Sequence, residues 1–159
     1  MTFCGELCYH QTVETALREL LREKGSEVFD IEPTATVQDA AIKMRKERIG
    51  ALLVMHSGEL VGIVTERDIL NGIVAEGASA EKISVQEIMT ADVVVIDPNR
   101  TIRDAMTVVT EKRLRHLPVA KEGRILGMLS GGDLTRSIVA EEEGFINTLY
   151  DYINGTYPG

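Results

Sequence analysis

Two short segments of this sequence place a hydroxyl side chain directly after an apolar run and a carboxylate three residues later. Thr65 precedes Asp68 in one segment, and Ser130 precedes Asp133 in the other. A hydroxyl group at a strand-to-helix junction can cap the helix, and an aspartate in the first turn is favoured by the helix dipole. The same geometry can bind a ligand, because free N–H groups and the hydroxyl donate to a phosphate while the carboxylate accepts from ribose hydroxyls. Either segment taken alone is explained by capping.

The two segments belong to a longer internal repeat. Shifted by 65 positions, residues 28–75 align with residues 93–140 without a gap, and 15 of the 48 pairs are identical, where chance gives roughly 3. The identities include glycines, a proline and aspartates, so turns and polar contacts recur together with the apolar core. Two similar units should pack about a pseudo-twofold axis, and a site at their junction should occur in two related but unequal copies. This recurrence favours ligand binding over capping alone.

Hydrophobic periodicity and turn residues predict the order β-α-β-β-α in each repeat, and therefore an α+β fold. In the first repeat we expect a strand at 28–31, a helix capped by Thr34 or Thr36 and ending near Glu47, strands at 51–55 and 60–64, and a helix at 67–75. In the second repeat we expect strands at 93–96, 116–119 and 125–129 and helices at 101–112 and 132–142.

Five segments follow from this pattern. Residues 1–27 form an N-terminal segment with a helix at 11–24 that Gly25 ends, and residues 28–76 form the first repeat. Residues 77–92 are a linker, and residues 93–142 form the second repeat. The tail, 143–159, carries an apolar helical stripe from Phe145 to Ile153 and is expected to pack on the body or on a second subunit.

Composition limits the class of protein. The chain has 159 residues, of which 44% are hydrophobic and 26% charged, as expected for one globular folding unit. No apolar run approaches the ~20 residues that span a bilayer, and the N-terminus lacks the basic stretch of a signal peptide, so a cytoplasmic location is expected. The net charge of −8 argues against binding to nucleic acids or to membrane surfaces, which need a basic face.

The sequence gives little indication of catalysis. It contains no P-loop, no G-x-G-x-x-G turn and no H-E-x-x-H motif, so we expect neither an enzyme nor a resident metal. Cys4, Cys8 and His10 provide three ligands, one fewer than a closed structural zinc site needs. One hypothesis, besides the two functions given below, is a small enzyme or metal protein that uses this trio. The simpler interpretation is that Cys4 and Cys8 are free thiols in a reducing compartment.

With its motifs in order, the chain resembles a tandem pair of CBS (cystathionine-β-synthase) domains, also called a Bateman module, over roughly residues 25–142. The resemblance rests on Asp30–Pro33 leading to Thr36–Ala40, on Glu87–Thr90 between the repeats, and on Arg115–Val119. The glycine–hydroxyl–x–x–aspartate segments match the nucleotide signature of the family.

The resemblance implies binding of an adenosine-containing ligand in clefts between the repeats. AMP is the ligand expected first, and ADP, ATP, NAD and S-adenosylmethionine are alternatives; no cofactor is required. Asp68 and Asp133 would hold the ribose, and Thr65 and Ser130 a phosphate. Ile63 and Met128 would flank the purine. The further candidate ligand-binding residues are Thr36, Ile49, Gly50, Ala51, Arg67, Thr101, Leu114, Arg115, His116 and Pro118.

The two clefts should differ in affinity. Arg67 precedes the first aspartate, whereas Gly132 precedes the second, and Arg115 in the second repeat corresponds to Gly50 in the first. A guanidinium binds a phosphate through paired charge-assisted hydrogen bonds. If each site draws on both repeats, Arg67 or Arg115 serves a cleft whose aspartate comes from the other repeat, and one cleft alone can be occupied.

Two functions therefore stay open. The resemblance implies a stand-alone regulatory module that forms a homodimer through its helices and signals to an unidentified protein. The alternative is an interaction scaffold with empty clefts, against which the intact hydroxyl–aspartate pairs argue.

Overall fold

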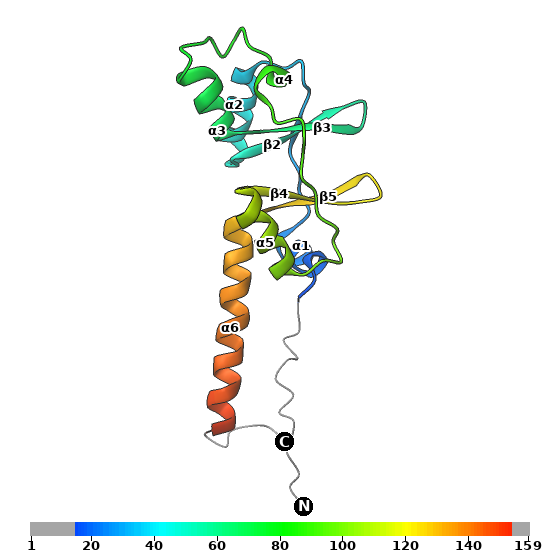
Figure 1. Ribbon diagram of the computed structural model, residues 1–159, viewed down its shortest axis with the longest axis vertical. Coiled ribbons are helices and arrows are strands. Elements are labelled where there is room, and N and C mark those ends of the chain that lie inside the picture. The colour runs from blue at the N-terminus through cyan, green and yellow to red at the C-terminus, as the bar shows by residue number, and fades with distance from the viewer. Residues whose placement is uncertain (1–14, 154–159) are drawn as a thin grey trace, which may run out of the picture.

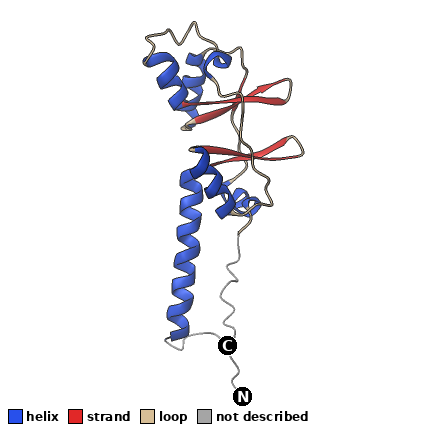
Figure 2. Ribbon diagram, viewed as in Figure 1, coloured by secondary structure: helices blue, strands red, loops and turns tan. Residues whose placement is uncertain are grey.

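The computed structural model describes residues 15–153, which form two similar lobes stacked along the long axis of the molecule (Figures 1 and 2). Each lobe is built on an antiparallel hairpin: β2 (Ala51–His56) pairs with β3 (Glu59–Thr65), and β4 (His116–Lys121) pairs with β5 (Arg124–Ser130). The two hairpins face each other at the centre, with the helices outside them (Figure 2). The α+β fold with two tandem repeats is confirmed.

Most of the remaining elements follow the predicted order, but α4 (Val85–Ile88) lies in the segment 77–92, which was expected to be a linker. A short strand, β1 (Asp30–Ile31), pairs in parallel with β2. The helices are α1 (Leu17–Lys24), α2 (Val37–Glu47), α3 (Glu66–Ile69), the π-helical segment η1 (Leu70–Val74), α4 (Val85–Ile88), α5 (Ile102–Lys112) and α6 (Gly131–Ile153).

The repeat extends to backbone conformation. Both hairpin turns place two residues at positive φ, Ser57 and Gly58 in one lobe and Glu122 and Gly123 in the other, as a tight two-residue hairpin requires. Helices α2 and α5 end on Arg48 and Arg113, both left-handed with φ of 56° and 54°. Positions that are 65 apart in the sequence therefore adopt the same turn, which explains why polar residues recur with the apolar ones.

Each lobe has its own apolar core. The first contains Leu52, Val54 and Val64 with Met44 from α2. The second contains Leu117, Val119 and Leu129 together with Leu17, Leu20 and Leu21 from α1. Helix α1 therefore crosses from the N-terminal segment into the second repeat, and Leu17 is completely buried there. The sequence pattern predicted the helix but not the lobe that it joins.

The strand predicted at 93–96 is reduced to a single bridge between Ile96 and Val119. In the first lobe, the Leu53 N–H donates to the Phe29 carbonyl at 3.1 Å and helps to hold β1 on β2. The residue that corresponds to Leu53 is Pro118, which has no N–H to donate. The ladder therefore loses one bond, and no strand forms.

Three predicted helices also differ from the structure. The helix expected at 11–24 begins at Leu17, since Thr15 and Ala16 are not helical. The helix expected at 67–75 begins at Glu66 and changes to the π-helical segment η1 at Leu70. The helix expected to end at 142 continues as α6 to Ile153, without a break before the tail, and projects beyond its lobe (Figure 1). Ile146 on this extension is 49% exposed, so this residue does not pack on the body.

The Cys4, Cys8 and His10 trio lies outside the described residues, as do residues 11–14 of the first predicted helix. Among residues 15–153, no helix has both the length and the apolar character needed to cross a membrane.

Candidate functional site

The hydroxyl–acid pairs are capping boxes, as the structural interpretation of the motif expected. Thr65 and Ser130 accept from the backbone N–H groups of Asp68 and Asp133 at the starts of α3 and α6. The same device caps α2, α4 and α5, through Thr36 with Asp39, Ser84 with Glu87 and Thr101 with Asp104. The motif alone therefore does not identify a ligand site, and the position of each pair in the fold must decide.

One of these pairs, Thr65 with Asp68, lies in a cleft between the two lobes, which we call cleft 1. Its floor and walls come from the end of β3, the start of α3, the segment after α4 and the α5–β4 connection. The lining residues are Gly50, Ile63, Thr65, Glu66, Arg67, Asp68, Thr90, Asp92, Val93, Val94, Arg113, Leu114, Arg115, His116 and Pro118.

The two oxygens of the Asp68 carboxylate differ in their contacts. Oδ2 accepts from the Thr65 backbone N–H at 2.8 Å and from the Thr65 hydroxyl at 2.7 Å. Oδ1 accepts no hydrogen bond from any residue within 15–153. Because the first oxygen fixes the orientation of the side chain, the second is held ready to accept hydrogen bonds from a bound molecule.

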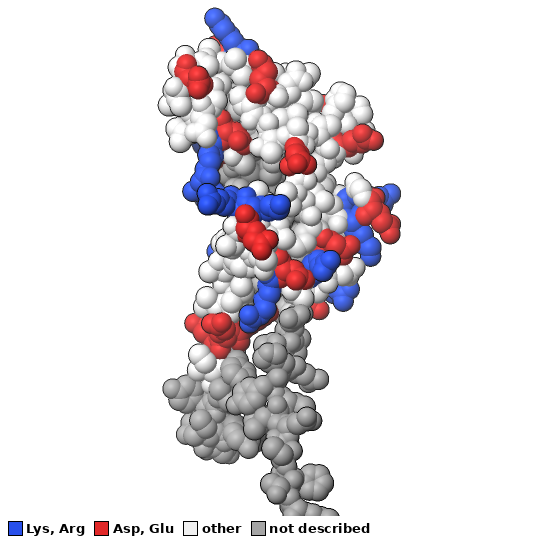
Figure 3. All heavy atoms as spheres, in the orientation of Figure 1, with Lys and Arg blue, Asp and Glu red and all other residues white. Residues whose placement is uncertain are grey.

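Three guanidinium groups line the same cleft. Arg67 lies in the first turn of α3, while Arg113 and Arg115 lie between α5 and β4. None of the three forms an ion pair or a side-chain hydrogen bond with another residue of the described chain. Figure 3 shows Lys and Arg side chains gathered across the groove between the lobes. The lining of cleft 1 thus combines three guanidinium groups with the carboxylates of Glu66, Asp68 and Asp92.

His116 contributes a further polar atom to the wall. Its Nδ1 is buried and has no hydrogen-bond partner among the described residues, which is costly unless a bound molecule or water supplies one. Burial lowers the pKa of His116; Lys24 and Arg115 lower it further, and Glu66 opposes them. The imidazole is therefore neutral at pH 7 and can donate or accept one hydrogen bond through Nδ1.

The structure brings most of the candidate residues together. Nine line cleft 1: Gly50, Ile63, Thr65, Arg67, Asp68, Leu114, Arg115, His116 and Pro118. Thr36 and Thr101 instead cap helices and are not among its lining residues. Ala51 is buried in β2, and Ile49 lines a neighbouring hollow beside α2 and α3. Cleft 1 is thus composite, with its aspartate from one repeat and two of its arginines from the other.

Sequence reasoning missed six lining residues, namely Glu66, Thr90, Asp92, Val93, Val94 and Arg113. Arg113 carried a usable signal, because it is identical to Arg48 in the other repeat. Thr90, Asp92, Val93 and Val94 belong to no repeated polar pattern, since 90–94 is the connection that crosses from one lobe to the other. Glu66 is not repeated either, because its counterpart is Gly131.

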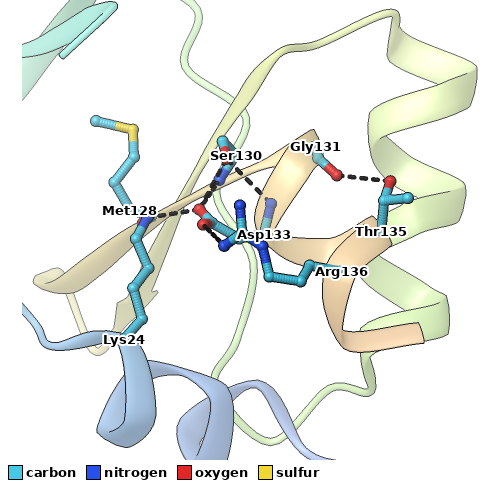
Figure 4. A network of polar contacts seen from close by, with 7 residues as sticks. All are labelled: Lys24, Met128, Ser130, Gly131, Asp133, Thr135 and Arg136. Carbon is cyan, nitrogen blue, oxygen red and sulfur yellow. Dashed lines mark hydrogen bonds and ion pairs between the residues drawn. The ribbon is translucent and has the colours of Figure 1, made fainter. Parts of the chain in front are cut away.

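The second hydroxyl–aspartate pair has a different environment (Figure 4). Asp133 Oδ2 accepts from the Ser130 N–H and hydroxyl, both at 2.8 Å, and also from Lys24 Nζ at 2.6 Å. Lys24 Nζ also donates to the Met128 carbonyl at 2.8 Å. Burial alone would raise the pKa of Asp133, but the hydrogen bonds from Lys24 and Ser130 outweigh it and lower the pKa.

No group of three or more His, Cys, Asp or Glu side chains within the described residues has the arrangement of a metal site.

Comparison with known proteins gives a consistent result. The family model of the CBS domain matches residues 25–75 and 85–140. The mitochondrial CBS domain-containing protein CBSX3 of Arabidopsis thaliana is 39% identical over 127 residues, which cover 77% of this chain and 62% of that protein. The chain thus spans less than two thirds of this relative.

Solved structures share the fold. The CBS domain structure of NE2398 is 42% identical, with a TM-score of 0.75, and the match covers 79% of this chain and 98% of that one. The hexameric CBS-CP12 protein from bloom-forming cyanobacteria is 29% identical, with a TM-score of 0.68 over 76% of this chain and 69% of that one. With two family matches, one on each repeat, this chain belongs to the CBS domain family.

Proposed function

We propose that the chain is a regulatory module that binds an adenosine-containing ligand in cleft 1 and passes the bound state to a partner protein. The observation that carries the proposal is the Asp68 carboxylate, oriented by its own capping box with Oδ1 unused in the cleft. A carboxylate oxygen in such a position accepts from ribose hydroxyls, as acidic residues do in other nucleotide sites.

The other groups of cleft 1 suit the remaining parts of a nucleotide. Arg67 lies in the first turn of α3 and lines cleft 1 together with Thr65, so a phosphate bound beside Thr65 would meet a positive charge. Ile63, Val93 and Val94 offer apolar surface to a purine. AMP is the first ligand to test, and ATP, NAD and S-adenosylmethionine share the adenine and ribose groups.

The proposed output is a change in association with another chain. Five apolar side chains on the helices of the described chain are more than 45% exposed: Ile42, Leu70, Val74, Val139 and Ile146. Exposed apolar side chains on helices support self-association through the helical side, and the cyanobacterial relative is hexameric. We therefore propose a homodimer as the assembly that the ligand regulates.

The test is a calorimetric titration with AMP, ADP, ATP, NAD and S-adenosylmethionine, on the ligand-stripped wild type and on two alanine variants. Asp68→Ala removes the proposed ribose acceptor together with one helix cap. Asp39→Ala removes a capping box of the same geometry, with Oδ2 on the Thr36 hydroxyl at 2.7 Å, but Asp39 does not line cleft 1. The two variants therefore lose the same kind of cap and differ in the ligand contact.

We expect saturable binding of at least one ligand to the wild type and to Asp39→Ala. Binding to Asp68→Ala should weaken about 10- to 100-fold, since a hydrogen bond to a charged group contributes about 1.5–3 kcal/mol. Equal affinities in the two variants would show that the ligand does not use Asp68. The absence of binding by all five compounds would favour the scaffold.

A further inference from the structure

Helix α1 packs on the second lobe in the place that α4 occupies on the first lobe. The N–H groups of Val85 and Gln86 donate to the carbonyls of Ala35 and Pro33, and those of Leu17 and Arg18 donate to Arg100 and Pro98. Each acceptor in the second lobe lies 65 positions after its counterpart in the first. The two helices thus occupy equivalent places although the repeat in the sequence does not include α1.

The equivalence extends to the glycine of each glycine–hydroxyl–x–x–aspartate segment. A Cβ on Gly62 would lie 2.5 Å from Met89 Sδ, and a Cβ on Gly127 would lie 2.6 Å from Leu21 Cδ2. Each hairpin is therefore covered closely by one side chain from its own helix segment. This contact fixes the position of the residues that follow Met89 and Leu21, among them Thr90, which lines cleft 1, and Lys24, which contacts Asp133.

The two segments then diverge. After α4 the chain is extended, and the Thr90 N–H donates to the Ile63 carbonyl at 2.9 Å. Helix α1 instead continues to Lys24, whose ammonium group donates to the Met128 carbonyl, the counterpart of that of Ile63. Lys24 therefore takes the hydrogen-bond position that a backbone amide occupies in the first lobe, and it brings a positive charge to the second.

The ammonium group of Lys24 contacts Asp133, the second of the two candidate ribose acceptors. Lys24 Nζ lies 2.6 Å from Asp133 Oδ2, and Arg136 Nη1 lies 3.8 Å from Asp133 Oδ1. The Asp133 side chain is only 13% exposed. Asp68 Oδ1, by contrast, has no partner among the described residues. The two aspartates have the same capping geometry, but cations contact only Asp133: Lys24 is held on Oδ2, the oxygen of the cap, and Arg136 lies near Oδ1.

A ligand at Asp133 would meet a carboxylate that already holds this ammonium group on Oδ2, and its ribose hydroxyls would compete with the ammonium group for the carboxylate. A charge-assisted hydrogen bond is roughly twice as strong as a neutral one, so ribose hydroxyls are weak competitors. Lys24 belongs to the same chain as Asp133, and three buried leucines of α1 hold it beside the carboxylate. Its contact with Asp133 therefore avoids the loss of translational and rotational freedom that a ligand from solution incurs.

We infer that Lys24 decides which cleft is used: its ammonium group, held on Asp133 Oδ2 and on the Met128 carbonyl, neutralises and crowds the second aspartate, so that each chain binds one adenosine ligand, in cleft 1. This inference rests on the proposed function, because it assigns the second copy of the same site. The difference in ligand affinity between the two copies of the site, which Arg67 and Gly132 led us to expect, would then arise from Lys24 of helix α1.

The test measures the number of ligands bound per chain by equilibrium dialysis with AMP and with ATP, on wild type, Lys24→Met and Lys43→Met. Methionine keeps an unbranched apolar stem and removes the ammonium group. Lys43 is a matched control, because it is 38% exposed, as Lys24 is, and likewise contacts a backbone carbonyl and a carboxylate, those of Asp30. Lys43 does not line cleft 1.

We expect one ligand per chain for wild type and Lys43→Met, and two for Lys24→Met, with the second lost again in Lys24→Met/Asp133→Ala. Two ligands on the wild type, or one on Lys24→Met, would overturn the role of Lys24 and leave the proposed function standing. One wild-type site that depends on Asp133 rather than Asp68 would overturn both the role of Lys24 and the assignment of the ligand to cleft 1. Absence of binding to every variant would overturn both.

Discussion

Replacing Leu17 with alanine tests whether α1 is an integral part of the second lobe. Leu17 has no exposed surface and packs in the cluster formed by Leu117, Val119 and Leu129. Truncating a fully buried leucine costs about 2–5 kcal/mol, through lost transfer free energy and the cavity left behind. Alanine forms helices at least as well as leucine, so the loss would come from packing rather than from helix propensity.

The assay is urea unfolding followed by circular dichroism, with Leu70→Ala as the matched control. Leu70 also lies on a helical segment but is 55% exposed, so its truncation should cost about 1 kcal/mol or less. For a protein of this size, Leu17→Ala should lower the melting temperature by about 2–4 °C per kcal/mol lost. A free energy of unfolding for Leu17→Ala no lower than that of Leu70→Ala would refute the placement of α1 and, with it, the anchoring of Lys24.

Three further results follow from the structure. Burial lowers the pKa of His116 from its ordinary 6.5, so the unfolded chain binds the proton more readily; the free energy of unfolding should fall as pH drops below about 6.5, less steeply in His116→Gln, and parallel pH profiles would contradict this. Val74 is 67% exposed on η1, and Val74→Asp should lower the mass measured by sedimentation toward that of a monomer, whereas an unchanged mass would exclude this surface. Gly62→Ala places a Cβ 2.5 Å from Met89 Sδ and should destabilise by about 1–3 kcal/mol in urea unfolding, whereas a Cβ in the control Gly132→Ala would lie no closer than 3.7 Å to Ser130 Oγ; equal stabilities of the two variants would contradict the contact.

Much of the fold could be predicted because the information is local and occurs twice. Thr36 and Thr101 begin α2 and α5 as capping residues, and Gly58 and Gly123 mark the hairpin turns. Where a single residue breaks the repeat, the prediction is wrong, as at Pro118, which removes the N–H that a strand at 93–96 would need. The end predicted for the last helix of the second repeat, at 142, was also wrong, because α6 continues through Gly144 to Ile153.

The candidate site was predicted in part for a different reason. Thr65, Asp68 and Arg115 could be identified from the repeat and are now found in one cleft. Lys24 could not, because its contact with Asp133 joins residues 109 positions apart, and α1 has no counterpart within the aligned repeat. The lobe that α1 joins depends on tertiary packing, which no local pattern in the sequence contains.

The central claim is that Asp68 holds the ribose of an adenosine ligand in cleft 1, and the most direct measurement is a crystal structure of the protein saturated with AMP. We predict ribose hydroxyls within hydrogen-bonding distance of Asp68 Oδ1, a phosphate near Thr65 and Arg67, and Lys24 still on Asp133. A ligand bound away from Asp68, or cleft 1 empty at a saturating concentration of AMP that calorimetry shows to bind, would contradict the account.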